Sequence, residues 1–330
     1  MLEEEAVSLS KLAVICVWGM AAALAHPALS QTYPTKPIRV ISTFGPGAVA
    51  DGVIRLVAQR LSASVGQPVL VEVQNGAGGT LGAQTLIRSM PDGYTILHTT
   101  PAALVSAPFL MRKPPYDPLK DFTYITHLVD AATCILVSNS LPVNTVMELI
   151  DYAKANPGKL AYGSNGVGGS FHLEMELLKQ KYGLDITHVP YRGGEDGLRA
   201  AAARELPIAF APASAAYAIA RTGKVRILAV LSSKRFPGMP DVPSMGEQLP
   251  DYEKVPGGGE IVGPAGMPAV IVRRLNADVV KALYMPEVLD RIRQIGFVAV
   301  GNTPEEHAAQ MKRAMEIMAQ GVKAARIPVE

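Results

Sequence analysis

The sequence predicts an α/β protein with two lobes, each built on a mainly parallel sheet flanked by helices. Short β-branched segments alternate with longer amphipathic segments along residues 38–110 and again along 145–231. Such alternation is typical of βαβ units with parallel strands. The 330 residues suffice for about two domains. A segment rich in Pro and Gly, residues 237–259, reads as a loop before a mostly helical C-terminal part.

The first series begins with a strand at residues 38–42, where β-branched residues stand between Pro37 and Gly45. Asp51 is placed to cap the following helix, which ends at Gly66. Two further strand–helix pairs follow. Their expected strands are 69–73 and 94–98, with turns at 75–82, 91–93 and 99–101.

The second series follows two extended segments, residues 123–128 and 132–137, which we interpret as a long connector into the second lobe. Thr145 and Glu148 form a capping box that opens a helix. The strand–helix rhythm then continues. The expected strands are 160–162, 186–189, 207–211 and 225–231.

The C-terminal part predicts three helices and one short strand. The helices are expected at 268–284, 286–295 and 303–325, and the strand at 297–300. Glu260–Gly263 is interpreted as a return connector, so that these elements rejoin the first lobe through a second hinge connector. The expected domains are a first lobe of residues 31–130 plus 256–330 and a second lobe of residues 131–255.

The first 30 residues predict a cleaved secretory signal peptide. An apolar run of 14 residues, Leu12–Ala25, follows Lys11 and is too short to span a bilayer. Small residues precede an expected cleavage site near Ser30. Three glutamates precede Lys11, whereas a signal peptide usually begins with positively charged residues. The alternative to a signal peptide is a buried core helix. The mature chain is therefore expected to be exported and not embedded in the membrane.

Composition argues against nucleic acid as a partner. The formal net charge is +2, and removing residues 1–30 takes away three glutamates and one lysine, which leaves +4. The charge is spread along the chain, without a basic run interleaved with aromatics. The mature chain keeps one cysteine, Cys134, which can form no internal disulfide and is expected to be a small buried apolar residue.

Two glycine-rich loops, each between a strand and a helix, stand out as candidate anion sites. They are residues 43–51, which we call the 43–51 loop, and residues 162–172, which we call the 162–172 loop. Glycine lets the backbone turn sharply and lets a ligand approach the amides. The first N–H groups of a helix lack internal partners and carry partial positive charge. Both loops therefore predict binding of a small carboxylate without Lys or Arg, while simple helix capping is the alternative for either one alone.

Catalytic motifs are not evident in the sequence. The Gly76–Gly82 segment misses the dinucleotide-binding spacing by one residue, and neither Ser164 nor Ser170 lies in a nucleophile elbow. His172 and Glu176 share a helix face, but two ligands are too few for a metal. No metal and no cofactor are expected. An enzyme such as a hydrolase remains only a remote alternative.

Seven motifs in order give the chain a resemblance to the substrate-binding proteins of tripartite tricarboxylate transporters, also called Bug proteins. The resemblance covers nearly all of the mature chain, from Tyr33 to the C-terminal helix. The motifs are Phe44–Gly47 with Asp51, Gly76–Gly79, Pro91–Thr95, Pro115–Phe122, Tyr162–His172, His188–Tyr191 and Pro240–Pro243.

This resemblance implies a two-lobed periplasmic binding protein of the type II-like class that closes on a small carboxylate. The implied partners are that ligand and the membrane permease subunits of the transporter, and the implied state is a monomer. A ligand-presenting component of a sensory system is the alternative. The candidate ligand-binding residues are Phe44, Gly47, Ala48, Val49, Thr99, Thr100, Ser164, Gly166, Gly168, Gly169, Ser170, His172, Tyr191 and Ala211.

Departures from the family pattern bear on specificity. Thr43, Gly45, Ala48 and Ala50 replace the usual residues of the first motif, and the return connector lacks the Trp often found there. Ala211 stands where many members carry Asp, a candidate partner for an ammonium group. We therefore expect a dicarboxylate-type or aromatic carboxylate ligand and not an amino acid.

Overall fold

The computed structural model describes residues 33–45, 48–255 and 257–327. Residues 1–36 and 37–330 form separate compact units. In the first, residues 33–36 form an irregular segment with Pro34 buried; the predicted signal peptide lies outside the described residues. The rest of this account concerns the second unit. Within the described ranges, no helix has the length and apolar character needed to cross a bilayer.

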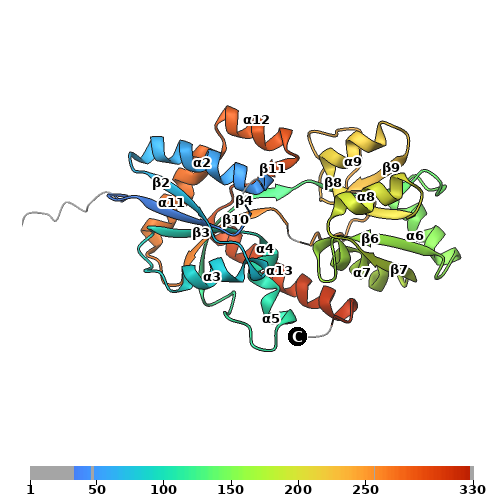
Figure 1. The fold of residues 1–330 in the computed structure, drawn as a ribbon, viewed down its shortest axis with the longest axis horizontal. Helices are drawn as coiled ribbons and strands as arrows, with labels where there is room; N and C mark the ends of the chain where they lie inside the picture. Colours follow the sequence, from blue (N-terminus) through green and yellow to red (C-terminus); the bar gives the residue numbers. More distant parts are fainter. Residues whose placement is uncertain (1–32, 46–47, 256, 328–330) are drawn as a thin grey trace, which may run out of the picture. The chain divides into compact units, whose positions relative to one another are not determined.

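The first sheet has strands from both ends of the chain and the order β11-β4-β10-β3-β1-β2 (Figure 1). β1 pairs in parallel with β2 and with β3, while β10 runs antiparallel to β3 and β4, and β11 antiparallel to β4. Among these described strands, β10 and β11 therefore point against the other four. The strands are β1 (Ile38–Ser42), β2 (Val69–Val73), β3 (Thr95–Thr99), β4 (Phe122–Ala131), β10 (Gly259–Pro264) and β11 (Phe297–Ala299).

The second sheet comes from one continuous stretch and has the order β7-β6-β8-β5-β9. β6 pairs in parallel with β7 and β8, and β5 runs antiparallel to β8 and β9. Both sheets are thus mixed in pairing, although most described strands of each point one way, as the βα rhythm predicted. The strands are β5 (Thr133–Ser138), β6 (Leu160–Ser164), β7 (Ile186–Pro190), β8 (Ile208–Pro212) and β9 (Val225–Val230).

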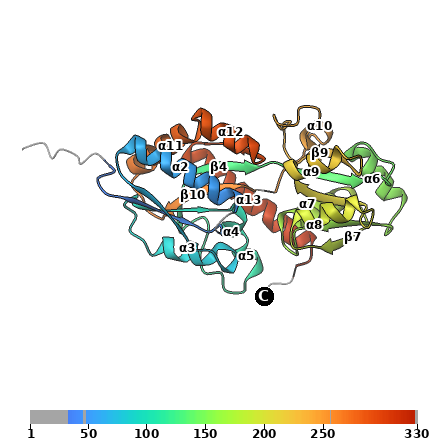
Figure 2. The ribbon, with the colours of Figure 1, turned by 45° about the horizontal axis from the view of Figure 1, so that its top comes forward.

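Helices cover both sheets and complete the predicted two-lobed α/β fold (Figures 1 and 2). Apolar side chains from the helices and strands form the cores, such as Leu149 and Tyr162 in the second lobe. The helices are α2 (Val49–Val65), the 3₁₀ turn η1 (Ala77–Gly79), α3 (Thr80–Ile87), α4 (Pro101–Val105), α5 (Ala107–Leu110), α6 (Val146–Ala155), α7 (Ser170–Tyr182), α8 (Gly194–Ala202), α9 (Ala213–Ala220), α10 (Met245–Gln248), α11 (Ala269–Leu283), α12 (Pro286–Gln294) and α13 (Pro304–Ala324).

The chain crosses between the sheets twice, and the outward crossing is shorter than predicted. β4 ends at Ala131 and β5 begins at Thr133, so the outward crossing is a single residue. Residues 123–128, 132–137 and Glu260–Gly263, interpreted from the sequence as connectors, lie in strands, apart from Ala132. The first and last belong to β4 and β10, which pair with each other in the first sheet, and the second belongs to β5 of the second sheet. Backbone pairing between segments far apart in sequence explains the difference, because a local pattern does not reveal it. The predicted domain boundaries stay a prediction.

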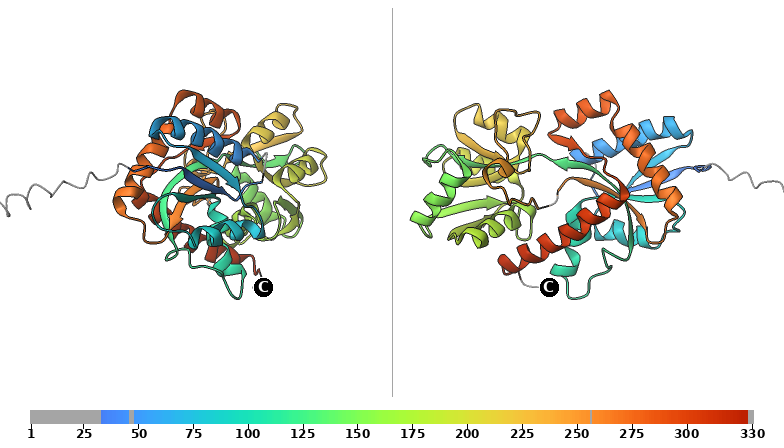
Figure 3. Two further views of the ribbon diagram at one scale, coloured as in Figure 1. Left: turned by 60° about the vertical axis from the view of Figure 1, so that its left-hand side comes forward. Right: turned by 180° about the vertical axis from the view of Figure 1, so that it is seen from behind.

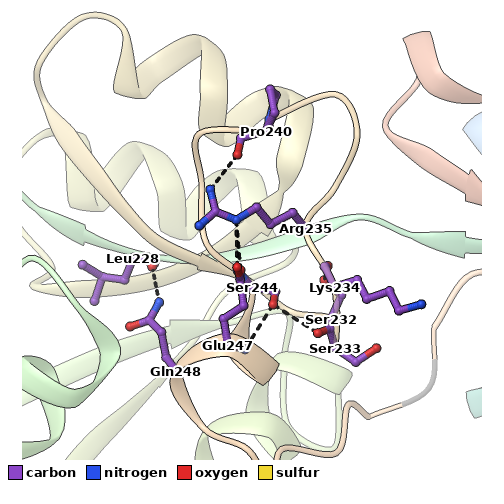
Figure 4. A network of polar contacts seen from close by, with 9 residues as sticks. All are labelled: Leu228, Ser232, Ser233, Lys234, Arg235, Pro240, Ser244, Glu247 and Gln248. Carbon is purple, nitrogen blue, oxygen red and sulfur yellow. Dashed lines mark hydrogen bonds and ion pairs between the residues drawn. The ribbon is translucent and has the colours of Figure 1, made fainter.

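The loop after β9 is held by side-chain contacts that the Pro and Gly content did not suggest (Figure 4). Ser244 and Glu247 form a capping box that starts α10, inside a segment predicted as loop throughout. Arg235 donates from Nε to the Glu247 carboxylate at 2.9 Å and from a terminal nitrogen to the Pro240 carbonyl at 2.7 Å. Gln248 donates to the carbonyl of Leu228 at 2.8 Å, which fixes α10 to β9.

The last helix, α13, packs on elements of both lobes. Its residues Met311, Ile317 and Met318 share one buried cluster with Leu173 of α7 and Leu104 of α4. In the right-hand view of Figure 3, the red helix extends from the first sheet toward the second lobe. The C-terminal helix therefore helps to position α7 against the first lobe.

Candidate functional site

A cavity of about 350 Å³ is lined by residues of both lobes, and we call it the shared cavity. Its volume lies at the lower end of the range for small-molecule sites. The beginning of α7, the beginning of α4, both crossings between the sheets and α13 contribute to its wall. The lining residues are Thr100, Ala102, Ala131, Thr133, Asn165, Gly168, Gly169, Ser170, Phe171, Glu174, Leu231, Lys254, Val255, Gly257, Gly258 and Met318.

The N-terminus of α7 supplies hydrogen-bond donors at this cavity. Gly166 and Gly168 have φ angles of 102° and 75°, which glycine adopts without strain, and they turn the chain from β6 into α7. The Phe171 N–H donates to Oδ1 of Asn165 at 3.1 Å. Within the described residues, the N–H groups of Ser170 and His172 have no acceptor. Ser170 lines the shared cavity, so its amide and hydroxyl can donate to a carboxylate there, as the 162–172 loop predicted, whereas His172 is not a lining residue.

A stack of aromatic rings supports the 162–172 loop. The rings of His172 and His188 are parallel to within 10° with centroids 3.9 Å apart, and Tyr162 stacks on the other side of His188. The Gly168 N–H donates to Nδ1 of His172 at 3.0 Å, and Oγ of Ser164 shares a hydrogen bond of 2.6 Å with Nε2 of His188. Burial, with the neighbouring His172, lowers the pKa of His188 to about 4, so the ring is neutral near pH 7.

The 43–51 loop is built differently. Thr43 donates its hydroxyl to that of Thr99 at 2.9 Å, and the Phe44 ring lies against His98 with centroids 4.7 Å apart. Burial lowers the pKa of His98 to about 3, so this ring too is neutral. Asp51, in the first turn of α2, accepts from Nε of Arg55 at 2.8 Å.

The predicted ligand residues separate into groups in the structure. Four of them line the shared cavity: Thr100, Gly168, Gly169 and Ser170. His172 lines a different cavity, of about 900 Å³, beside His188 and the end of α13. Gly47 lies outside the described residues, as does the side chain of Val49. The rest are not lining residues of the shared cavity in the described part of the chain: Phe44, Ala48, Thr99, Ser164, Gly166, Tyr191 and Ala211.

Two of these placements change the argument made from sequence. The Ser164 hydroxyl is buried and bonded to His188 and to the N–H of Gly166, so it holds the loop. Ala211 is fully buried in β8 opposite Cys134, whose burial also fits the expected apolar role. The argument that Ala211 disfavours an amino acid therefore loses its basis, because the side chain at this position does not reach the shared cavity.

Sequence reasoning missed two charged residues of the cavity wall. Glu174 is 3% exposed, and its carboxylate accepts the N–H of Val255 at 3.1 Å. Burial raises the pKa of Glu174 to about 7. Lys254 donates from Nζ to Oδ1 of Asp130 at 2.7 Å and to the carbonyl of Ala131 at 2.8 Å. Glu174 carries a weak local signal, an acid among apolar neighbours in the second turn of α7, whereas nothing in the loop around Lys254 indicates a cavity.

The polar groups do not form an evident catalytic or metal site. Ser164 and His188 are hydrogen-bonded, but the serine is 1% exposed and the described residues give the histidine no carboxylate partner. A nucleophile needs access to substrate and an activated base. Within the described residues, no group of three or more His, Cys, Asp or Glu side chains is arranged to hold a metal.

A model of the tripartite tricarboxylate transporter family receptor matches residues 53–322 of the chain. A UPF0065 protein of Bordetella pertussis is 36% identical over 277 residues, which are 84% of this chain and 84% of that protein. Protein BugT of the same species is 32% identical over 304 residues, which are 89% of this chain and 91% of BugT.

Solved structures agree with this match. The periplasmic binding protein BugD is 29% identical with a TM-score of 0.67, and the comparison covers 90% of this chain and 100% of BugD. Rpa4515 of R. palustris with adipate is 29% identical with a TM-score of 0.70 and the same coverage. MatC from Rhodopseudomonas palustris with bound malate is 28% identical with a TM-score of 0.66, covering 88% of this chain and 100% of MatC. These neighbours are solute-binding proteins and not enzymes.

Proposed function

The chain belongs to the tripartite tricarboxylate transporter receptor family, and from this premise we propose that it captures a small carboxylate in the shared cavity and delivers it to the permease of such a transporter. The ligand class is a di- or tricarboxylate or an aromatic acid. Capture takes place in the periplasm, after export and removal of the signal peptide. The protein is a solute receptor, and its chemistry is binding and not turnover.

The observation that carries the proposal is the open N-terminus of α7 at the cavity wall. Ser170 lines the cavity, its N–H group has no acceptor among the described residues, and its hydroxyl lies at the same point. The first turn of α7 contains no acidic residue that would compete with an anion. A helix N-terminus of this kind favours a carboxylate through both hydrogen bonds and the helix dipole. The neighbours with adipate and with malate support this ligand class.

The remaining predicted residues take supporting positions in this proposal. Gly166, Gly168 and Gly169 set the backbone of the loop, and the stacked His172 and His188 hold it from behind. Thr100 lines the opposite wall, where its side chain accepts the N–H of Ala103 at 3.0 Å. Phe44, Ala48 and Thr99 stay predicted contacts of the ligand.

Isothermal titration calorimetry of the mature protein tests the proposal. The panel is adipate, malate, citrate and benzoate, with aspartate and glutamate as amino-acid comparisons. We expect at least one plain carboxylate to bind, and the two amino acids show whether the site accepts an ammonium group. Ser170→Ala should weaken binding about twofold to tenfold, because one neutral hydrogen bond contributes about 0.5–1.5 kcal/mol.

The matched control is Ser214→Ala, which changes an exposed serine in the first turn of another helix, α9. It should leave the affinity unchanged. Absence of binding for every carboxylate in the panel would contradict the proposed function. Equal affinities for the wild type and Ser170→Ala would show that this hydroxyl does not touch the ligand.

A further inference from the structure

Lys254 places a fixed positive charge in the wall of the shared cavity. It stands on the segment that returns from the second sheet to the first, just before β10. Its side chain is 17% exposed, and its ammonium group contacts Oδ1 of Asp130 at 2.7 Å and the carbonyl of Ala131 at 2.8 Å. An ammonium has three donors, so one remains after these two contacts.

The backbone holds this charge at one place. Gly258 lies so close to β4 that an added Cβ would come within 1.9 Å of the carbonyl oxygen of Val129, which excludes any larger residue there. The return segment is therefore pressed against the end of β4, beside Asp130. On its other side, the N–H of Val255 is bonded to Glu174 of α7 at 3.1 Å. Lys254 is thus fixed between the two lobes and next to the helix that carries the open N-terminus.

We propose that Lys254 is a specificity-determining residue of the ligand site, whose ammonium group binds a second anionic group of the ligand. This inference rests on the proposed function. The N-terminus of α7 and Lys254 are separate positive features of one cavity wall, the first made of backbone N–H groups and the second a full charge. Such a pair selects a dianion over a monocarboxylate of equal length, because the monocarboxylate leaves one of the two features without a partner.

The charges around Lys254 support this assignment. Asp130 is its only ion-pair partner among the described residues, and Asp130 itself is not a lining residue of the cavity. Glu174 lines the cavity but is buried, and its neutral form persists to near neutral pH. Glu174 is about half ionised at pH 7, and Lys254 is the cation among the described lining residues, where a ligand carboxylate shares it with Asp130.

The competing explanation is structural, in which Lys254 merely ties the return segment to β4 through Asp130. Two substitutions separate these roles, since each removes the ion pair but only one removes the cation. Lys254→Met removes the charge, whereas Asp130→Asn breaks the pair and leaves the ammonium free for the ligand. The double variant removes both charges of the pair and leaves neither of them unpaired.

The experiment is calorimetry with adipate and hexanoate, which have six carbons each and differ by one carboxylate. We expect the wild type to prefer adipate. Lys254→Met should weaken adipate binding at least tenfold and hexanoate binding less than threefold. Asp130→Asn should keep or tighten adipate binding, and the double variant should behave like Lys254→Met. Lys281→Met, at an exposed lysine of α11, is the matched control and should bind like the wild type.

Thermal unfolding of every variant shows whether it is folded at the temperature of the titration. Equal weakening by Lys254→Met and Asp130→Asn would overturn the proposal in favour of the structural role. Equal losses for adipate and hexanoate, or a wild type that prefers hexanoate, would also overturn it while leaving carboxylate capture intact. A wild type that binds no carboxylate at all would remove the proposed function and, with it, this inference.

Discussion

The N-termini of α2 and α7 show how the same local arrangement can favour or disfavour an anion. Each helix follows a strand and a glycine-containing loop, and neither has a side chain that caps it. In α2 the first turn contains Asp51, whose carboxylate already occupies the positive end of the helix dipole. In α7 the first turn has no acidic residue. A helix N-terminus is thus open to a ligand only where the chain does not place its own carboxylate there.

The acidic residues nearest to the two helix starts also differ in their partners and in their burial. Asp51 has a cationic partner, with Nε of Arg55 at 2.8 Å from its carboxylate. Glu174, in the second turn of α7, is buried with one backbone N–H as its hydrogen-bond donor, and burial raises its pKa to about 7. The acid near the open helix end is therefore mostly neutral below neutral pH, where it does not repel a bound carboxylate. The predictions below test this contrast, beginning with the largest effect.

Glu174→Gln should stabilise the protein at alkaline pH by roughly 3 kcal/mol. The carboxyl group has a higher pKa in the folded state, about 7, than its ordinary value of 4.5. As the pH rises from 4.5 to 7 the unfolded chain loses this proton before the folded chain does, so stability falls over that window. Above about pH 7 the destabilisation is complete. The glutamine keeps an acceptor for the N–H of Val255 but cannot ionise.

Urea unfolding at pH 4.5 and pH 8 measures this effect. The variant and the wild type should be nearly equal in free energy of unfolding at pH 4.5 and should differ most at pH 8. Glu205→Gln, at an exposed glutamate, is the control and should show the same small difference at both pH values. A Glu174→Gln protein that is less stable than the wild type at pH 8 would mean that the carboxylate is ionised and well paired.

Gly169→Ala should weaken carboxylate binding about tenfold, which corresponds to roughly 1.4 kcal/mol. Gly169 precedes the first residue of α7, and an added Cβ would lie 2.4 Å from Oδ1 of Asn165. Asn165 would have to move, and the N–H of Phe171 would lose its acceptor. The displaced loop would no longer present the Ser170 amide at the cavity.

Gly193 offers the matched control because it precedes α8 in the same way. An added Cβ at Gly193 has nothing within 4 Å, and its φ of −167° suits any residue. Gly193→Ala should therefore bind a carboxylate like the wild type in calorimetry. If both alanine variants bind normally, the backbone of the 162–172 loop does not determine affinity.

The local elements near these helices were predictable, whereas the cavity wall was not. The strands Ile38–Ser42 and Val69–Val73 lie where β-branched residues indicated, and α13 lies where a helix was expected at 303–325. These features depend on neighbours in sequence. Lys254 meets Asp130 across 124 positions, so its place in the cavity depends on how the two sheets are joined and has no local signature.

The 162–172 loop could be predicted because its signal lies in neighbouring residues. The roles of its side chains depend on contacts with distant parts of the chain, which a local pattern does not reveal. Glycines at 166 and 168 have the positive φ angles that their positions suggested. The same local reasoning assigned Ser164 to the ligand, but its hydroxyl is taken by His188, which is 24 residues away. It also gave the 43–51 and 162–172 loops equal weight, and only the second has residues among the described lining of the shared cavity.

Asp51→Asn gives the smallest expected effect and tests the first of the two helices directly. The substitution removes the ion pair with Arg55 and the favourable interaction of a carboxylate with the start of α2. The free energy of unfolding should fall by about 0.3–1 kcal/mol. Carboxylate affinity should change less than twofold, because α7 and not α2 supplies the open N-terminus. Calorimetry on this variant, after its unfolding has been measured, gives the change in carboxylate affinity. A marked gain in affinity would show that Asp51 repels the ligand and that α2 also faces the bound anion.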